Sequence, residues 1–146
     1  RNFVLDGASG ERLAYANSVW VFMDVEKGRP TRPRPEDVLP YGAEPALEME
    51  YEDRKIRLPE NLQVKPSFPV RKYHIDTNEH VNNCQYVQMA LEVLPEELPI
   101  HQIRVEYKKS AVLGDVIFPK VAEEENRIVT ELCDQDGKPY AVIEIR

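Results

Sequence analysis

The sequence predicts an α+β fold with one long helix and an antiparallel sheet. Apolar residues recur with helical spacing over residues 81–93, which is typical of a helix that buries one face. Four segments that alternate apolar and polar residues follow this helix, at 103–112, 116–122, 128–133 and 140–145. Short turns rich in Gly, Asp, Asn and Glu separate them, and this pattern predicts antiparallel strands joined by hairpins.

The chain begins with a predicted hairpin. Residues 3–5 form one expected strand, residues 6–10 a Gly-rich turn, and residues 13–23 a longer second strand. Two strands alone are only marginally stable in water. We therefore expect this hairpin to belong to a larger sheet.

A proline-rich stretch follows the hairpin. Eight of the twelve prolines lie in residues 27–69, where their fixed φ angles favour an extended chain. Within this stretch we expect Pro35 to open a short helix that reaches Leu39, and residues 46–51 to form a brief strand. The composition is that of a tether between two domains.

Residues 68–75 alternate as a strand does and lead towards the predicted helix. Pro95 and Pro99 end that helix, because a residue that precedes proline avoids the helical conformation. The predicted order is therefore a strand, one long helix and four further strands.

Three polar side chains lie between that strand and the helix, at Asp76, Asn78 and His80. Their spacing of two would place them on one side of an extended segment. Unpaired N–H groups at a helix start can stabilise an oxyanion, and an imidazole beside them can move a proton. The same residues also fit an ordinary helix cap, with Glu79 in the first turn. Spacing alone favours the cap.

The longer string around these residues favours a functional site. Residues 76–83 are Asp-Thr-Asn-Glu-His-Val-Asn-Asn, and Tyr86 follows. This string resembles the D-x-N-x-H-V-N-N-x-x-Y signature of the acyl-acyl carrier protein thioesterases, a family of plant plastid enzymes and bacterial relatives. Residues 105–109, Val-Glu-Tyr-Lys-Lys, resemble the family's second block. Residues 1–24 and the Arg-Pro-rich run after them also look like the middle of family members.

The resemblance implies two hotdog domains in one chain. It predicts that residues 1–26 are the terminal hairpin of a partly represented N-terminal hotdog, 27–67 an interdomain linker, and 68–146 a complete C-terminal hotdog. The first and last hairpins share an Asp-containing Gly turn followed by an apolar-Ala pair, as two copies of one domain would. We therefore expect the chain to be part of a longer protein, although Asp-Gly hairpins are common and can be alike by accident.

The reaction that the resemblance implies is hydrolysis of a fatty-acyl thioester of acyl carrier protein. It releases a free fatty acid and the carrier thiol, and it ends fatty acid elongation. In this interpretation Asn78 orients the carbonyl or the water, His80 acts as general base or stabilises the developing charge, and Asp76 orients these groups or assists the base. The N–H groups over residues 81–83 are candidate oxyanion donors.

Substrate binding is expected from Asn82, Asn83 and Ser110. Ser110 also marks a departure from the family, because plant members carry Glu-Cys where this chain has Ser110-Ala111. A cysteine nucleophile is therefore excluded at that place. Ser110 can hold a water by hydrogen bonding, and Glu106 is a carboxylate near it in sequence.

The formal charge of −7 argues against a nucleic acid partner, since phosphate binding needs a basic surface. Basic residues nevertheless lie beside both motifs, at Arg71, Lys72, Arg104, Lys108 and Lys109. They predict either a rim that docks an acidic acyl carrier protein or an ordinary solvated strand face. Hotdog sheets tend to pair, either with a second copy of the chain as a homodimer or between the two hotdog domains of one chain.

No cofactor and no metal are expected. A thioester carbonyl is electrophilic enough that positioned water and oxyanion stabilisation can do most of the work. His74, Asp76 and His80 could be drawn as metal ligands, but a strand-to-turn segment does not set tetrahedral geometry.

The compartment is predicted from cysteines and hydropathy. Cys84 and Cys133 are the only cysteines, and we expect both to be reduced, which favours a cytoplasmic protein. No run of about 18 or more apolar residues occurs, so no membrane span is predicted.

Three other functions share the predicted fold. One is a thioesterase for coenzyme A esters, and another is a hotdog protein that binds acyl chains or acyl carrier protein without hydrolysing them. The third is a hotdog dehydratase or hydratase, which also uses a His with an acidic residue. The full signature favours the acyl carrier protein thioesterase.

Overall fold

The computed structural model describes residues 2–42, 44–95 and 98–146. The chain forms two compact units, Arg1–Tyr51 and Glu52–Arg146. The second unit begins inside the stretch 27–67 that the sequence predicts as a linker. The division into domains at residues 26 and 67 stays a prediction.

The first unit contains the expected N-terminal hairpin. Strand β1 (Asn2–Asp6) pairs antiparallel with β2 (Arg12–Asn17). Gly10, at φ 86°, supplies the left-handed residue that the turn between them requires. The second strand ends at Asn17, earlier than the predicted residue 23.

Four short elements complete the described part of the first unit. They are β3 (Met23–Asp24), which pairs with β4 (Arg29–Pro30), and helix α1 (Pro35–Val38), which continues into the 3₁₀ turn η1 (Leu39–Tyr41). The helix begins at Pro35 as predicted. The strand predicted for residues 46–51 is wrong, because these residues form bends and irregular chain.

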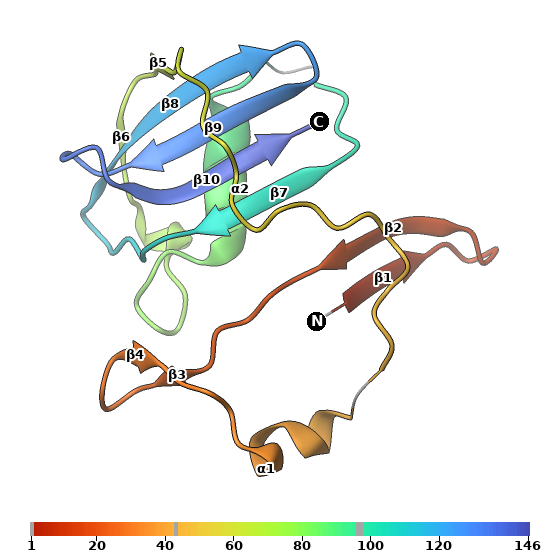
Figure 1. Cartoon of the computed structure of the whole chain (residues 1–146). Helices are drawn as coiled ribbons and strands as arrows, with labels where there is room; N and C mark the ends of the chain where they lie inside the picture. The colour runs from red at the N-terminus through yellow and green to blue at the C-terminus, as the bar shows by residue number, and fades with distance from the viewer. Residues whose placement is uncertain (1, 43, 96–97) are drawn as a thin grey trace. The chain divides into compact units, whose positions relative to one another are not determined.

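The second unit is built on one antiparallel sheet (Figure 1). Its strand order is β5-β8-β9-β10-β7, and β6 pairs with β8 beside β5. The strands are β5 (Gln63–Val64), β6 (Phe68–Pro69), β7 (Ile103–Tyr107), β8 (Val116–Glu124), β9 (Arg127–Cys133) and β10 (Pro139–Ile145). Strands β8, β9 and β10 and the two hairpins that join them are those that the sequence predicts. Strand β7 ends at Tyr107, earlier than the predicted residue 112, and it pairs with β10 instead of forming the expected hairpin with β8. Strand β5 lies in the predicted linker.

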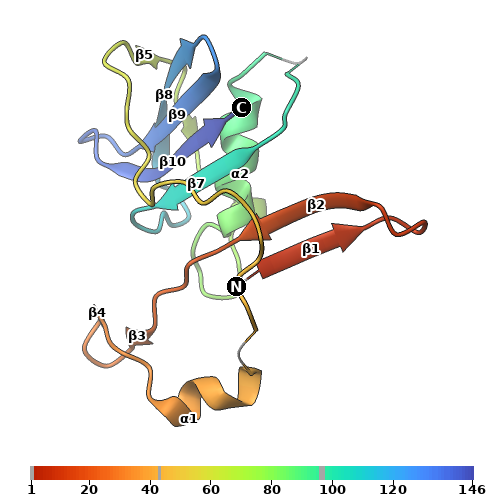
Figure 2. The same cartoon turned by 45° about the vertical axis from the view of Figure 1, so that its right-hand side comes forward.

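Helix α2 (Asn83–Glu92) crosses one face of this sheet and contacts β9 and β10 (Figures 1 and 2). It begins two residues later than predicted and ends one residue earlier. Its buried residues join apolar side chains of the sheet in one core, which includes Tyr86, Met89, Ala90, Leu132, Ala141 and Ile143. No helix in the described part of the chain is long and apolar enough to span a membrane.

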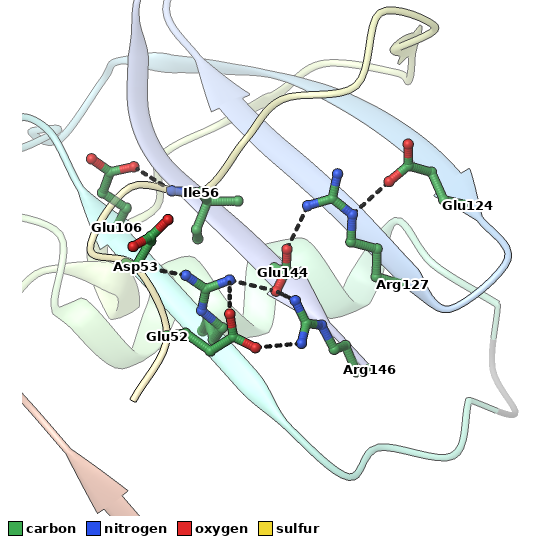
Figure 3. A network of polar contacts seen from close by, with 9 residues as sticks. Glu52, Asp53, Ile56, Glu106, Glu124, Arg127, Glu144 and Arg146 are labelled. Atoms are coloured by element: carbon green, nitrogen blue, oxygen red, sulfur yellow. Dashed lines mark hydrogen bonds and ion pairs between the residues drawn. The ribbon is translucent and has the colours of Figure 1, made fainter. Parts of the chain in front are cut away.

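A strap, defined as residues 52–58, covers the opposite face of the sheet (Figure 3). Ile56 is buried there against Val129 of β9 and Val142 of β10. The Ile56 N–H donates to a carboxylate oxygen of Glu106 in β7 at 3.2 Å. The strap therefore runs across three strands before the chain joins the far edge as β5.

Charged side chains anchor the strap to this outer face. Glu144 of β10 has no exposed surface, and its two oxygens lie 2.8 Å from Arg104 and 2.6 Å from Arg127. Arg146 bridges Glu144 at 3.0 Å and Glu52 of the strap at 2.5 Å. With Glu124 these residues form the outer ionic cluster: Glu52, Arg104, Glu124, Arg127, Glu144 and Arg146 (Figure 3).

Candidate functional site

The signature begins in a tight turn in front of helix α2. Ile75 and Val81 form an isolated antiparallel bridge, so the chain reverses direction between them. Asp76 holds this turn, because its Oδ1 accepts from the N–H groups of Asn78 at 2.7 Å and His80 at 3.4 Å. The Asp76 N–H donates to the His80 carbonyl at 2.8 Å. The carboxylate thus fixes the backbone on which Asn78 and His80 stand.

The strand expected at residues 68–75 is wrong beyond its first two residues. After β6 the chain enters a 3₁₀ turn, η2 (Lys72–His74), and the signature itself forms the turn rather than an extended run. Alternation in a strand therefore does not bring Asp76, Asn78 and His80 to one side. Asp76 is partly buried under the turn, whereas the side chains of Asn78 and His80 are exposed.

Asn82 makes the cap of helix α2. Its backbone is extended, and its side-chain oxygen accepts from the Cys84 N–H at 2.9 Å, which satisfies one of the unpaired donors at the helix start. The helix cap is therefore Asn82, six residues after Asp76. Asp76, Asn78 and His80, whose pattern fits either a cap or a functional site, lie before the cap. Asn82 is exposed, but its oxygen is used within the chain.

Two of the three expected oxyanion donors are already engaged. The Val81 N–H donates to the Ala111 carbonyl at 2.9 Å, and the Asn82 N–H donates to the His74 carbonyl at 2.9 Å. Asn83 is the first residue of the helix, and an N–H in the first turn has no acceptor within its own helix. Of the three candidate donors, the Asn83 N–H is therefore the one that suits an incoming oxyanion.

The second block meets the signature through Ala111. The Ala111 N–H donates to the hydroxyl of Tyr86 at 2.8 Å, while its carbonyl accepts from Val81. Ser110 directly precedes Ala111 and is exposed. The structure therefore brings the Ser110–Ala111 segment to the helix start, and Tyr86 is a linking residue whose only signal in the sequence is its place in the signature.

Glu106, from the same block, lies on the other face of the sheet. It accepts from the Ile56 N–H of the strap and pairs with Lys108 (Figure 3). This carboxylate therefore anchors the strap and does not face the signature. Ala111 is fully buried, so a thiol at this position would be enclosed in the core.

His74 is a buried histidine near the signature turn. The sequence pattern does not identify it as a catalytic residue. Its Nδ1 accepts from the Arg71 N–H at 2.8 Å, which places the proton of the neutral ring on Nε2. Burial, followed by the charge of Arg71, lowers the pKa of His74. His74 also lines a hollow of about 400 Å³ between β6, η2 and α2, together with Phe68, Gln85, Gln88 and Met89.

The basic residues beside the motifs differ in their partners. Lys108 pairs with Glu106, Lys109 with Asp134, and Arg104 belongs to the outer ionic cluster. Arg71 and Lys72 are exposed on the chain that leads into the turn. These two are the cations best placed to meet an acidic partner at the signature.

In the described part of the chain the cysteines and acidic residues form no metal site. Cys84 is exposed and Cys133 buried, both as free thiols, and burial raises the pKa of Cys133 to about 11. Within residues 2–42, 44–95 and 98–146 no three His, Cys, Asp or Glu side chains are grouped so as to hold a metal ion.

The sheet, the helix on one face and the polar turn at the helix start together define a hotdog-fold protein. The chain belongs to the acyl-ACP thioesterase family, since residues 59–146 match the family model for the acyl-ACP thioesterase C-terminal domain. Both the resemblance seen at residues 76–86 and the predicted α+β hotdog fold are confirmed.

Individual relatives agree with this assignment. The chain is 29% identical over 157 residues to oleoyl-acyl carrier protein thioesterase 2, chloroplastic, of Arabidopsis thaliana, a match that covers 94% of this chain and 42% of the relative. The chain thus spans about two-fifths of that relative's length.

Two solved structures share the fold. An acyl-ACP thioesterase from Bacteroides thetaiotaomicron superposes with a TM-score of 0.86 and 21% identity, over 99% of this chain and 60% of that one. The 12:0-ACP thioesterase from Umbellularia californica gives a TM-score of 0.74 and 17% identity, over 99% and 58%.

Proposed function

We propose that the protein hydrolyses the thioester of fatty-acyl acyl carrier protein to a free fatty acid and the carrier thiol. The observation that carries this proposal is the junction at the start of α2. There the Asp76–His80 turn, the first helical N–H groups and the Ser110–Ala111 segment are held together by backbone hydrogen bonds and by N–H donors to the side chains of Asp76 and Tyr86. Membership of the thioesterase family supports the same reaction class.

Water is the nucleophile in this reaction. Its oxygen attacks the thioester carbonyl carbon, His80 takes the proton as general base, and the carbon–sulfur bond then breaks. The thiolate that leaves recovers a proton and departs as the carrier thiol. Asn78 orients the carbonyl or the water, and Asp76 serves both residues by fixing their turn.

The developing oxyanion is stabilised at the helix start. The Asn83 N–H lies at the positive end of α2, where negative charge is favoured. Ser110 holds the attacking water or the substrate by hydrogen bonding. Asn82 contributes by capping the helix and so fixing Asn83. Because positioning and oxyanion stabilisation suffice for a thioester, the proposal includes no cofactor.

The proposed partner is an acidic acyl carrier protein. Arg71 and Lys72 are exposed directly before the signature, so they suit the acidic surface from which a loaded prosthetic arm would reach the turn. A cytoplasmic location fits this partner and the two free thiols.

The test is thiol release by the full-length protein from medium- and long-chain acyl carrier protein, beside acyl-coenzyme A. His80→Ala should lower kcat by about a hundredfold or more, as loss of a general base does. His101→Ala is the matched control, since His101 is exposed in the segment that leads to β7. Turnover of His80→Ala equal to that of the control would remove His80 from the mechanism.

A second candidate function is binding without hydrolysis. It is favoured by Ser110-Ala111 in place of the Glu-Cys of plant relatives and by the exposure of His80 and Asn78. A folded protein that binds acyl carrier protein but releases no thiol would establish this function. Release from acyl-coenzyme A at the same or a higher rate would instead indicate a thioesterase for coenzyme A esters.

A further inference from the structure

We propose that Tyr86 is a positioning residue, whose hydroxyl fixes the Ser110–Ala111 segment against the catalytic turn. The inference rests on the proposed function and adds a role for the last residue of the signature. Tyr86 lies in the second turn of α2 and is 2% exposed, so it acts through the segment it holds and does not touch substrate.

The hydrogen bonds around Ala111 show how this segment is held. The Tyr86 hydroxyl accepts from the Ala111 N–H at 2.8 Å, which fixes the peptide unit that joins Ser110 to Ala111. The Val81 N–H donates to the Ala111 carbonyl at 2.9 Å, which fixes the next peptide unit. Both partners belong to the signature, one from the helix and one from its approach. The position of Ser110 is therefore set by the signature, residues 76–86, which also carries His80.

Burial makes the Tyr86 hydrogen bond hard to replace. Ala111 has no exposed surface, so its N–H would lack a partner if the hydroxyl were removed, and a buried unpaired N–H is unfavourable. The segment would then shift towards water and carry Ser110 with it. Displacements on the order of 1 Å near a reacting group can lower turnover by about a hundredfold.

Other contacts hold only the ends of the segment. The Lys108 N–H donates to the Tyr140 carbonyl at 2.8 Å before it. After it, Asp115 accepts from the Val112 N–H and from the Tyr140 hydroxyl, each at 3.0 Å. The middle of the segment is held by hydrogen bonds between Ala111 and both Tyr86 and Val81. Only the bond to Tyr86 involves a side chain.

The alternative is that Tyr86 is an ordinary core tyrosine whose hydroxyl satisfies a buried N–H. Tyr140→Phe is the matched control for this alternative, because it also removes one tyrosine hydroxyl that hydrogen-bonds within the same part of the unit. The Tyr140 hydroxyl bonds Asp115 and not the Ser110–Ala111 peptide. A general loss of packing would affect both variants alike.

Kinetics of the full-length protein on acyl carrier protein thioesters test the inference. Tyr86→Phe should lower kcat between about tenfold and a hundredfold and change KM less than kcat, because Tyr86 itself does not touch substrate. Tyr140→Phe should keep kcat within about twofold. In a double-mutant cycle, Ser110→Ala and Tyr86→Phe should be strongly non-additive, since both remove the same positioned group.

Amide hydrogen exchange supplies a readout that does not need activity. In Tyr86→Phe the Ala111 amide should exchange faster, while the amides of β9 and β10 remain protected. Should Tyr86→Phe fail to fold, difluorotyrosine at position 86, assayed at a pH low enough to keep its more acidic phenol protonated, weakens the hydroxyl as an acceptor without removing it, and it should give an intermediate loss of kcat.

Three results would overturn the inference: unchanged kcat in Tyr86→Phe, equal losses in Tyr86→Phe and Tyr140→Phe, or independent losses that multiply with Ser110→Ala. A native protein that releases no thiol overturns the proposed function and the catalytic part of this inference with it. Amide hydrogen exchange at Ala111 in Tyr86→Phe then still decides whether Tyr86 fixes the Ser110–Ala111 segment.

Discussion

The two faces of the sheet in Glu52–Arg146 are both buried, but by opposite chemistry. Along β10, Ala141, Ile143 and Ile145 belong to the apolar core with helix α2. The alternate residues Val142 and Glu144 face the strap and the outer ionic cluster. One strand thus places a fully buried carboxylate between two fully buried aliphatic side chains.

The difference shows that burial on this sheet is achieved in two ways. On the helix face, apolar contacts alone exclude water, so stability there should depend little on pH or salt. On the outer face, Glu144 is tolerated because three arginines surround it, and a buried charge is costly unless it is paired. The outer face should therefore respond to both pH and salt.

The helix face should show the largest effect of a single truncation. Ile143→Ala leaves a cavity between the sheet and α2, where Ile143 has no exposed surface, and should lower the free energy of unfolding by about 4 kcal/mol. Urea unfolding measures this loss. Val64→Ala, at an exposed position in β5, is the control, and a similar loss there would contradict the comparison.

Removal of the buried charge should have the next largest effect. Glu144→Gln leaves three arginines without their central carboxylate and should cost about 3 kcal/mol, the lower end for a broken buried pair, because the arginines are partly exposed. Glu123→Gln, at an exposed position in β8, should change stability little. The loss should shrink at high salt if the cluster is electrostatic in origin.

The same variant also tests the pH dependence of the outer face. Burial alone would raise the pKa of Glu144, but hydrogen bonds from Arg127 and Arg104 outweigh it and hold this pKa below its ordinary value of 4.5. The contribution of Glu144 is therefore complete above pH 4.5 and is lost as the pH falls through the lower folded value. Native protein and Glu144→Gln should converge in stability below that pH. A constant difference between them would argue against this linkage.

The apolar anchor of the strap should contribute less. Ile56 is 3% exposed between Val129 and Val142, and Ile56→Ala should cost about 2 kcal/mol, because a strap can settle into the gap more easily than a helix can. Hydrogen exchange should rise in residues 52–58 and not in α2. Equal exchange in the strap of both proteins would show that the ionic anchors suffice.

The ionic anchor of the strap should have the smallest effect. Glu52→Gln removes the pair with Arg146, in which both side chains are about one-third exposed, so a loss of about 0.5 kcal/mol is expected. Glu60→Gln, exposed beyond the strap, is its control. A loss above that of Ile56→Ala would mean that charge holds the strap and apolar burial does not.

The elements that local pattern specifies were predictable from the sequence. The helical period after His80 and the alternating strands with their Gly and Asp turns have local signals, and α2 and β7–β10 follow them. The strap and the outer ionic cluster have no such signal. Their members come from positions as far apart as Glu52 and Arg146, and only the register of the sheet brings them together.

The signature located the candidate site, but the roles of its residues stay predictions and its geometry was not predictable from spacing. The signature identified the turn and the helix start, yet spacing suggested an extended run where Asp76 closes a turn through its carboxylate. The cap at Asn82 and the bond from Ala111 to Tyr86 depend on which backbone groups remain unpaired after folding. Such pairing is a property of the folded chain, which residue spacing does not encode.

Glu79 shows how selection can act on the turn. It is a non-glycine residue at φ 61°, a left-handed conformation that costs about 1 kcal/mol for an ordinary side chain. Glycine would relieve that strain but would also loosen the backbone one residue before His80. Variants at position 79 sorted for thermal stability should therefore be enriched in Gly and Asn, while sorting for turnover should retain side chains that stiffen the turn.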